Sequence, residues 1–309
     1  MDLSIASPTG KQFIIHAGAY SATICEVGAT LRSLTCDGVE LVDGFGPDEF
    51  SLSGRGQVLA PWPGRLDHGA FSFGGHQAQA AINDIEHDAA IHGLVRWRSF
   101  ELISHDSDAV VLGMRIFPSP SYPFSVLLTL EYRVGPEGLV VSAQARNVGT
   151  EACPFALGFH TYLTLGDLID TATLTFPGTI SLSVNDRLIP TGENVPVKGT
   201  PCDFTSGGSI GAVVLDTTFS NLNRSSDGTA VTILGDTAMK RRVELWVDEQ
   251  FGYLQLFTGD TIGDVGRRRR GLAVEPMTAP PNTLQSGEAL IVLTPDEEWR
   301  GQFGIRSGK

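Results

Sequence analysis

The sequence has few cysteines, few basic residues and no long apolar run, and each shortage excludes a class of protein. No stretch approaches the roughly 18 consecutive apolar residues that a membrane-spanning helix needs. The four cysteines, Cys25, Cys36, Cys153 and Cys202, form no CxxC pair, so neither a zinc knuckle nor a disulfide scaffold is expected. With 22 Lys and Arg against 35 Asp and Glu, the net charge of −13 disfavours nucleic acid as a partner.

Export signals and cofactor motifs are missing as well. A secretory signal has a basic segment followed by an apolar one, and the N-terminal sequence MDLSIASPTGKQF has neither. Together with the scattered cysteines, this favours a soluble, cytoplasmic protein with no membrane association. There is no GxGxxG between a strand and a helix, which argues against a nucleotide site. We expect no cofactor.

What the sequence does contain is a succession of short strand patterns separated by turns. Alternating or β-branched runs occur along most of the chain, the clearest being VVLGMRIF, SVLLTLEYRV, GLVVSAQARNVG, VTILG, RRVELWVDE and YLQLFTG. Turn signals such as GPEG at 135–138 and SSDG at 225–228 lie between them. Even the Ala-rich segment 78–94 has no sustained helical repeat, so a long loop is predicted there. The fold class is mainly β.

These patterns predict one domain. They continue from Gln12 to Phe303 without a linker or a change in composition. Because antiparallel sandwiches and barrels reach about 250 residues as one unit, we expect residues 1–309 to form a single large antiparallel β-sandwich. The arginine run at 267–270 falls between two strand patterns, where a solvated loop is favoured over a phosphate-binding patch.

Three polar residues stand in apolar runs, where burial requires a partner. They are His92 in AAIHGL, His160 in ALGFHTYL and Glu275 in GLAVEPM. Either histidine alone is more often a hydrogen-bonded core residue than a functional one. A buried carboxylate, by contrast, is usually paired, bound to a metal or used in catalysis. A glutamate and a histidine with shifted pKa values are also what proton transfer near neutral pH requires.

A zinc site built from the same three residues is the competing interpretation. Zinc accepts two histidines and one glutamate as ligands, with a fourth position left for water. The separations in this chain, however, lack the short HxH or HExxH spacing that commonly supplies the first two ligands. We therefore rank a metal site below proton transfer and expect no metal.

Six segments, in order along nearly the whole chain, resemble those of the aldose 1-epimerase (galactose mutarotase) family, most of all its bacterial general aldose epimerases. They are LAPWPGRLDHGAFSFGG at 59–75, IHGLVRW at 91–97, FALGFHTYLTL at 155–165, VLDTTF at 214–219, YLQLFTG at 253–259 and AVEPMTAPPNTLQSGEAL at 273–290. The last, with its Glu-Pro-Met-Thr motif, is the most specific.

The resemblance implies a fold, an activity and a set of residues. The fold is a galactose mutarotase-like β-supersandwich with an open sugar cleft. The activity is that of a carbohydrate isomerase, interconverting the α and β anomers of a free aldose such as galactose or glucose. Glu275 matches the family's general base and His160 its general acid. Four further residues match positions that hold the sugar: Arg65, His92, Asp216 and Gln255.

The residue types suit this chemistry independently of the resemblance. Ring opening removes one proton and delivers another to a different atom of the same sugar, so a carboxylate and an imidazole can divide the work. Arg65 can direct two donors at adjacent hydroxyls, and Asp216 can accept from a hydroxyl pair. The expected partner is a monosaccharide bound by a monomer or homodimer.

Three departures from the family pattern leave other functions open. Gly64 stands where the family usually has Asn, Ala89 replaces another Asn, and Leu163 replaces an aromatic residue. Two side-chain amides that could bind hydroxyls are thus missing, and the wall beside His160 is expected to change. One alternative is a sugar-binding or regulatory module without catalysis. Less favoured are a hexose-phosphate epimerase, which needs a basic pocket, and a glycosidase, which needs two carboxylates.

Overall fold

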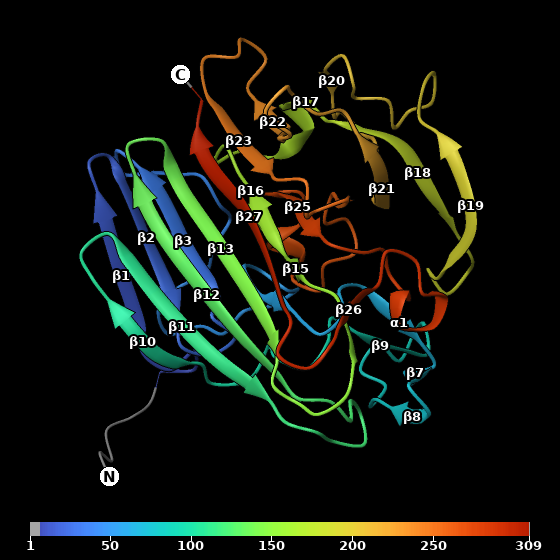
Figure 1. The fold of residues 1–309 in the computed structure, drawn as a ribbon. Helices are drawn as coiled ribbons and strands as arrows, with labels where there is room; N and C mark the ends of the chain where they lie inside the picture. The colour runs from blue at the N-terminus through green and yellow to red at the C-terminus, as the bar shows by residue number, and fades with distance from the viewer. Residues whose placement is uncertain (1–6, 309) are drawn as a thin grey trace.

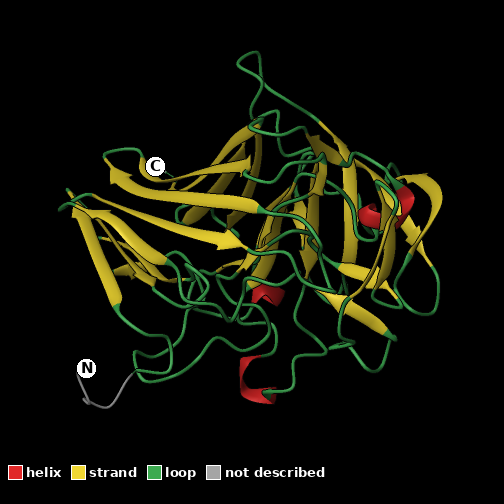
Figure 2. Ribbon diagram, turned by 60° about the horizontal axis from the view of Figure 1, so that its bottom comes forward, coloured by secondary structure: helices red, strands yellow, loops and turns green. Residues whose placement is uncertain are grey.

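Strands are the main regular structure of the chain, as the alternating sequence patterns predict. The structure is a computed structural model in which residues 7–308 are described. Along β12 (Val126–Gly135), buried side chains alternate with more exposed ones, because successive residues of a strand point to opposite faces. Figure 2 shows strands and loops throughout, with only short helical segments between them. The predicted mainly β fold class is confirmed.

The largest sheet has nine strands, and their spatial order differs from their order along the chain. In spatial order they are β10 (Glu101–His105), β11 (Ala109–Ile116), β12, β13 (Gly138–Asn147), β27 (Glu298–Ser307), β23 (Arg242–Val247), β22 (Ala230–Gly235), β17 (Thr173–Thr175) and β20 (Gly208–Ser209). The last strand of the chain, β27, pairs with both β13 and β23 and so joins segments distant in sequence.

The second large sheet has eight strands. In spatial order they are β19 (Pro190–Pro196), β18 (Gly178–Val184), β21 (Asp216–Leu222), β24 (Tyr253–Phe257), β25 (Leu272–Met277), β15 (Gly158–Phe159) and β5 (Val58–Leu59), with β16 (Thr161–Leu163) also paired to β25. All these pairings are antiparallel. Every residue of β25 is buried, so side chains on both faces of this strand are covered by the rest of the protein.

Smaller sheets and three short helical turns complete the molecule. A four-stranded sheet consists of β1 (Gln12–Ala17), β2 (Tyr20–Cys25), β3 (Leu31–Cys36) and β4 (Val39–Glu40). Three two-stranded sheets pair β14 (Cys153–Phe155) with β26 (Ile291–Leu293), β6 (Arg65–Asp67) with β9 (Ala89–Ile91), and β7 (Ala70–Phe73) with β8 (His76–Gln79). The helical turns are η1 (Ile169–Thr171), η2 (Val265–Arg267) and α1 (Thr283–Ser286). Figure 1 shows β1–β3 against β10–β13, and β18, β19 and β21 on the opposite side.

One hydrophobic core extends through both large sheets. It includes Leu128 of β12, Leu245 of β23 and Val274 of β25, each fully buried. Such continuous burial is the main source of stability in a fold of this kind. In the part of the chain that is described, the helices are too short and too polar for any of them to cross a bilayer.

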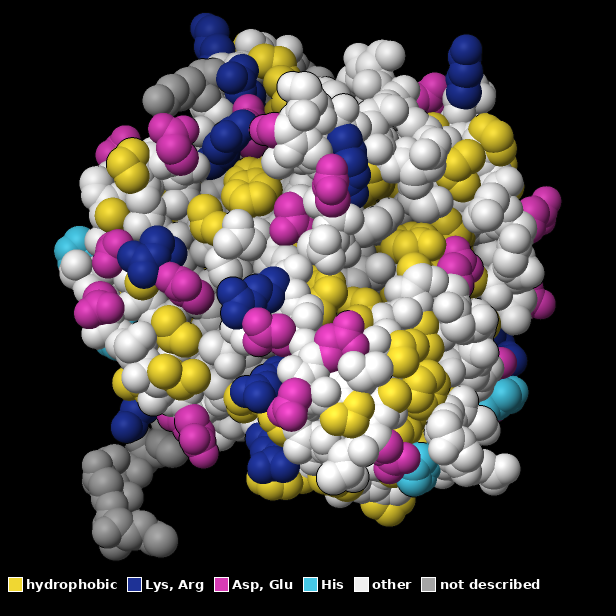
Figure 3. Space-filling view, in the orientation of Figure 1, with side chains coloured by type: hydrophobic (Ala, Val, Ile, Leu, Met, Phe, Trp, Pro, Cys, Tyr) yellow, Lys and Arg dark blue, Asp and Glu magenta, His cyan; other side chains and the backbone are white. Residues whose placement is uncertain are grey.

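The arginine run at 267–270 forms part of an ion-paired surface. Arg269 pairs with Asp170 and Asp260, at 3.1 and 2.8 Å, and Arg267 approaches Asp43 at 3.4 Å. Figure 3 likewise shows acidic and basic side chains interspersed over the visible face rather than gathered by sign. The run therefore starts at the end of the helical turn η2 and continues into a loop, and two of its arginines are engaged with carboxylates rather than simply solvated.

Candidate active site

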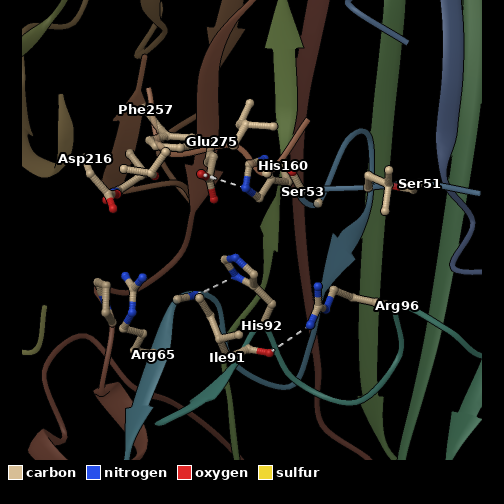
Figure 4. Close-up of a pocket in the computed structure, with 18 of the residues that line it drawn as sticks. Ser51, Ser53, Arg65, Ile91, His92, Arg96, His160, Asp216, Phe257 and Glu275 are labelled. Atoms are coloured by element: carbon tan, nitrogen blue, oxygen red, sulfur yellow. Dashed lines mark hydrogen bonds and ion pairs between the residues drawn. The ribbon is translucent and has the colours of Figure 1, made fainter. Parts of the chain in front are cut away.

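One cavity contains all six residues that the sequence singles out for a site. Its volume is about 340 Å³, within the range of roughly 300–1,000 Å³ typical of small-molecule sites. Lining it are Arg65, His92, His160, Asp216, Gln255 and Glu275. Figure 4 shows side chains from several different strands and loops converging on this space. The fold therefore brings together residues as far apart in sequence as Arg65 and Glu275, while their chemical roles stay predictions.

Glu275 and His160 form the buried floor of the cavity. Glu275 lies on β25, and His160 lies between β15 and β16, both of which pair with β25. The two side chains are 4% and 7% exposed, respectively, and the distance from His160 Nε2 to Glu275 Oε1 is 3.3 Å. At this separation the carboxylate and the ring can contact two oxygens of one small molecule at the same time.

The strand register places two further polar groups beside Glu275. Gln255 on β24 is the direct partner of Glu275 on β25, so both side chains point to the same face of the sheet. Gln255 Nε2 donates to Asp216 Oδ1 at 2.6 Å, and Asp216 begins the next strand, β21. This chain of contacts forms a polar wall whose carboxylate, Asp216, is exposed toward the cavity.

His160 is held by an aromatic stack and a tight loop. Its ring stacks on Tyr162, with centroids 5.0 Å apart and planes inclined by 16°. The Arg55 guanidinium lies 4.8 Å from the centroid of Tyr162 and pairs with Asp43 at 2.9 Å. A side chain at Gly54, whose φ is +77°, would overlap the His160 ring. These contacts fix the orientation of the imidazole toward Glu275.

His92 is held by a reciprocal pair of hydrogen bonds with Gly64. The His92 backbone N–H donates to the Gly64 carbonyl at 2.9 Å, and the Gly64 N–H donates to His92 Nδ1 at 3.2 Å. His92 has a φ of +66°, a conformation that costs about 1–2 kcal/mol for a residue other than glycine. Because Nδ1 accepts, the neutral ring carries its proton on Nε2, which is left to donate to a ligand.

Arg65 is anchored from behind by an acidic residue. Its Nε donates to Asp84 Oδ2 at 2.7 Å, and His87 Nδ1 lies 2.9 Å from Asp84 Oδ1. This anchor uses one edge of the guanidinium, so its terminal nitrogens can face the cavity that Arg65 lines. A planar group oriented in this way suits adjacent hydroxyl oxygens.

Burial shifts the pKa values of the floor residues in opposite directions. For Glu275, burial and then the negative charge of Asp216 raise the pKa well above 4.5. For His160, burial and then the positive charges of Arg96 and Arg55 lower the pKa to about 3. His160 Nδ1 also has no hydrogen-bond partner within residues 7–308, which further disfavours the imidazolium. Burial and the nearby charge of His160 likewise lower the pKa of His92, keeping it neutral.

Comparison with known proteins shows which family the chain belongs to. The aldose 1-epimerase family model matches residues 11–306. The chain belongs to the aldose 1-epimerase family. A relative from Escherichia coli (strain K12), named "Uncharacterized protein YihR", is 32% identical over 307 residues, covering 96% of this chain and 93% of its own. Galactose mutarotase of Homo sapiens is 23% identical, covering 96% of this chain and 94% of its own.

A solved structure confirms the predicted fold. The GalM/aldose epimerase homologue from C. elegans superimposes with a TM-score of 0.86 at 19% identity, covering 96% of this chain and 98% of its own. The galactose mutarotase-like β-supersandwich is therefore confirmed. Membership of the aldose 1-epimerase family supports a general aldose epimerase function, that is, a carbohydrate isomerase.

The structure explains two departures from the family pattern and corrects the expectation about a third. Gly64 has a φ of +63°, and a Cβ there would lie 2.7 Å from Pro281 Cγ, so an asparagine at this position would require Pro281 to shift. Ala89 on β9 is fully buried and does not line the cavity. Leu163 was expected to change the wall beside His160, but it is fully buried in the core. Its side chain follows the strand alternation of β16 away from the site.

The aldose 1-epimerase cavity also contains a set of metal-ligand types. Donor atoms of His92, His160 and Glu275 all lie within 4.8 Å of one another. This set has the composition of a catalytic zinc site with two histidines and one glutamate. The sequence analysis ranked this arrangement below proton transfer, because the three residues come from separate strands and loops and so lack the short spacing of common zinc motifs. A divalent ion that bound here would compete with a sugar for the same side chains.

Sequence reasoning missed several residues that line the cavity. Arg96 and Trp97 lie on the segment after β9, and Phe50 and Ser53 lie on the loop before β5. The rings of Phe50 and Trp97 are in edge contact, with centroids 6.2 Å apart, and both are about half exposed at the cavity mouth. The signal for Arg96 was its place four residues after His92 within IHGLVRW.

Proposed function

We propose that this protein catalyses mutarotation, the interconversion of the α and β anomers of a free aldose. The observation that carries the proposal is the buried pair of Glu275 and His160, 3.3 Å apart, whose pKa values shift in opposite directions. Mutarotation needs a base at the anomeric hydroxyl and an acid at the ring oxygen, and both oxygens are bonded to the same carbon. A close acid–base pair is suited to that arrangement.

In the proposed reaction, Glu275 is the base and His160 the acid. Glu275 takes the proton from the C1 hydroxyl while His160 gives its proton to the ring oxygen. The bond between C1 and the ring oxygen breaks, and C1 becomes an aldehyde. Rotation about the C1–C2 bond presents the other face of the aldehyde, and the two proton transfers then run in reverse. No atom is gained or lost, and no cofactor takes part in the proposed steps.

Burial favours both proton transfers. A raised pKa makes Glu275 a stronger base, and a lowered pKa makes His160 a stronger acid. Ring opening converts a charged carboxylate–imidazolium pair into a neutral one, and a buried site favours the neutral form. The reactive charged form is correspondingly the less populated one before the reaction.

The other predicted residues would hold the sugar around this pair. Asp216 would accept hydrogen bonds from ring hydroxyls, and the 2.6 Å hydrogen bond from Gln255 holds its carboxylate. Arg65 and the Nε2–H of His92 would donate hydrogen bonds to the opposite side of the sugar. A single monosaccharide is the proposed ligand, since the cavity of about 340 Å³ is partly closed by protein on the floor and sides.

The direct test follows anomer exchange by saturation-transfer NMR across a panel of aldoses, after subtraction of the spontaneous rate. Glu275→Gln and His160→Gln should each lower catalysed exchange by roughly 10²- to 10⁴-fold, the usual contribution of a general acid or base. Glu288→Gln, which removes an exposed glutamate outside the cavity, is the matched control and should keep full activity. Binding of sugars without exchange in the unaltered protein would instead indicate a sugar-binding module.

A further inference from the structure

Arg96 is a charged residue of the cavity that takes no part in the proposed binding of the sugar. Its side chain lines the cavity, and its hydrogen bonds are long and go to neutral oxygens. Nη1 donates to Gln57 Oε1 at 3.4 Å, and Nη2 donates to the Ile91 carbonyl at 3.3 Å. Throughout residues 7–308, no carboxylate comes within 4.0 Å of its guanidinium, the limit for an ion pair.

The other two arginines near the site are each satisfied by a carboxylate. Arg55 pairs with Asp43 at 2.9 Å and Arg65 pairs with Asp84 at 2.7 Å. Partly buried arginines are normally paired in this way, because removing a cation from water is costly. Burial lowers even the pKa of Arg96, to about 10. Arg96 is thus a desolvated cation that faces a ligand cavity without a protein anion.

The position of Arg96 indicates which part of a sugar it would meet. Figure 4 shows Asp216, Glu275, His160 and Arg96 in that order across the cavity. If Glu275 contacts the C1 hydroxyl and His160 the ring oxygen, the path from Glu275 to His160 runs from C1 to the ring oxygen. Beyond the ring oxygen comes C5 with its substituent C6, on the side of Arg96. C2 and C3 then lie toward Asp216.

Resting on the proposed mutarotase function, we propose that Arg96 binds an anionic group on C6, so that the preferred substrate is an acidic aldohexose rather than a neutral one. A guanidinium presents two parallel N–H donors that fit two oxygens of a carboxylate, phosphate or sulfonate. The neighbouring Trp97 and Phe50 give this end of the cavity an apolar rim, which strengthens a charge contact by excluding water. With Arg96, the cavity contains a second arginine besides Arg65.

The test compares kcat/KM for anomer exchange of glucose with that of three sugars differing at C6: glucuronate, glucose 6-phosphate and 6-deoxy-6-sulfoglucose. The spontaneous rate of each sugar is measured and subtracted. At least one acidic sugar should exceed glucose by about 10-fold or more, and the best of the three identifies the anion. Arg96→Gln should lower the ratio of acidic to neutral kcat/KM by roughly 10- to 100-fold, mainly through KM.

Two further variants make the result specific to the guanidinium. Arg96→Lys keeps the charge without the planar pair of donors and should recover part of the ratio. Arg98→Gln removes the same charge from an exposed side chain two residues away and should leave the ratio unchanged. Equal or better exchange of glucose than of every acidic sugar overturns this inference alone. Absence of exchange with all four sugars overturns the proposed function and this inference with it.

Discussion

At the scale of single residues, the site places two ionisable side chains where their surroundings disfavour their charged forms. Glu275 is buried on all sides, and the charge of Asp216 adds to the rise of its pKa. His160 is equally enclosed, and its Nδ1 lacks a partner within the described chain. The two residues therefore share one proton over a wide pH range and titrate as a pair.

The pH dependence of exchange follows from this shared proton. Activity should be lost on the acidic side as the pair gains a second proton near the lowered pKa of His160, about 3. On the alkaline side it should be lost as the single proton leaves near the raised pKa of Glu275. Asp216→Asn removes a charge that raises the Glu275 pKa, so the alkaline limb should move to lower pH. An unmoved alkaline limb in Asp216→Asn contradicts this account.

Glu275 should also lower the stability of the folded protein as the pH rises. A carboxyl whose pKa is raised on folding is compatible with the fold while protonated and destabilises it once it must ionise in place. Stability in the unaltered protein should therefore fall as the pH passes from the ordinary value of 4.5 through the raised one. The melting temperature of Glu275→Gln should therefore rise relative to that of the unaltered protein as the pH increases from 5 to 9. A difference in melting temperature that stays constant across this pH range would argue that burial does not raise the pKa of Glu275.

At the scale of elements, strands were easier to predict than the loops that shape the cavity. The alternation along SVLLTLEYRV predicts β12, and the apolar run around Glu275 predicts β25. The carboxylate in that run marked the site because burial of a charge needs a reason. The loop before β5 has no periodic pattern, yet it supplies Ser53 and Gly54 to the cavity wall. Its course is set by tertiary contacts that no local pattern encodes.

Gly54 tests how closely that loop controls His160. Gly54→Ala would force a Cβ into the His160 ring, and a shift of about 1 Å at a reacting group can cost roughly 100-fold in rate. We expect that loss in exchange activity. Gly74→Ala is the matched control, because Gly74 also has a positive φ, +58°, but nothing lies within 4 Å of its Cβ position. Similar activity in the two variants would show that His160 tolerates the displacement.

At the scale of the whole molecule, the sequence predicted the sheet architecture but not how distant residues pair. The strand patterns and motif order indicate the β-supersandwich. The sequence does not indicate that Asp84 anchors Arg65 or that Arg96 has no carboxylate partner in the described part of the chain. Both features depend on which loops meet across the sheet. A net charge of −13 likewise said nothing of a local cation in the cavity.

The core should hold the fold without disulfides or bound ions. All four cysteines are free, and the hydrophobic core spans both large sheets. Reduction with dithiothreitol, or removal of divalent ions with EDTA, should leave both the melting temperature and sugar exchange unchanged. Loss of exchange on treatment with EDTA, restored by zinc, would instead assign a metal to His92, His160 and Glu275.

The exposed rim of the cavity also gives the protein its own optical signal. Of the four tryptophans, Trp62 and Trp299 are buried, Trp246 is partly buried, and Trp97 alone is more than half exposed, at 53%. A sugar seated beneath Trp97 would change the polarity around a single indole while the other three stay in place. Intrinsic fluorescence should therefore report occupancy of the cavity directly, without a label and without turnover.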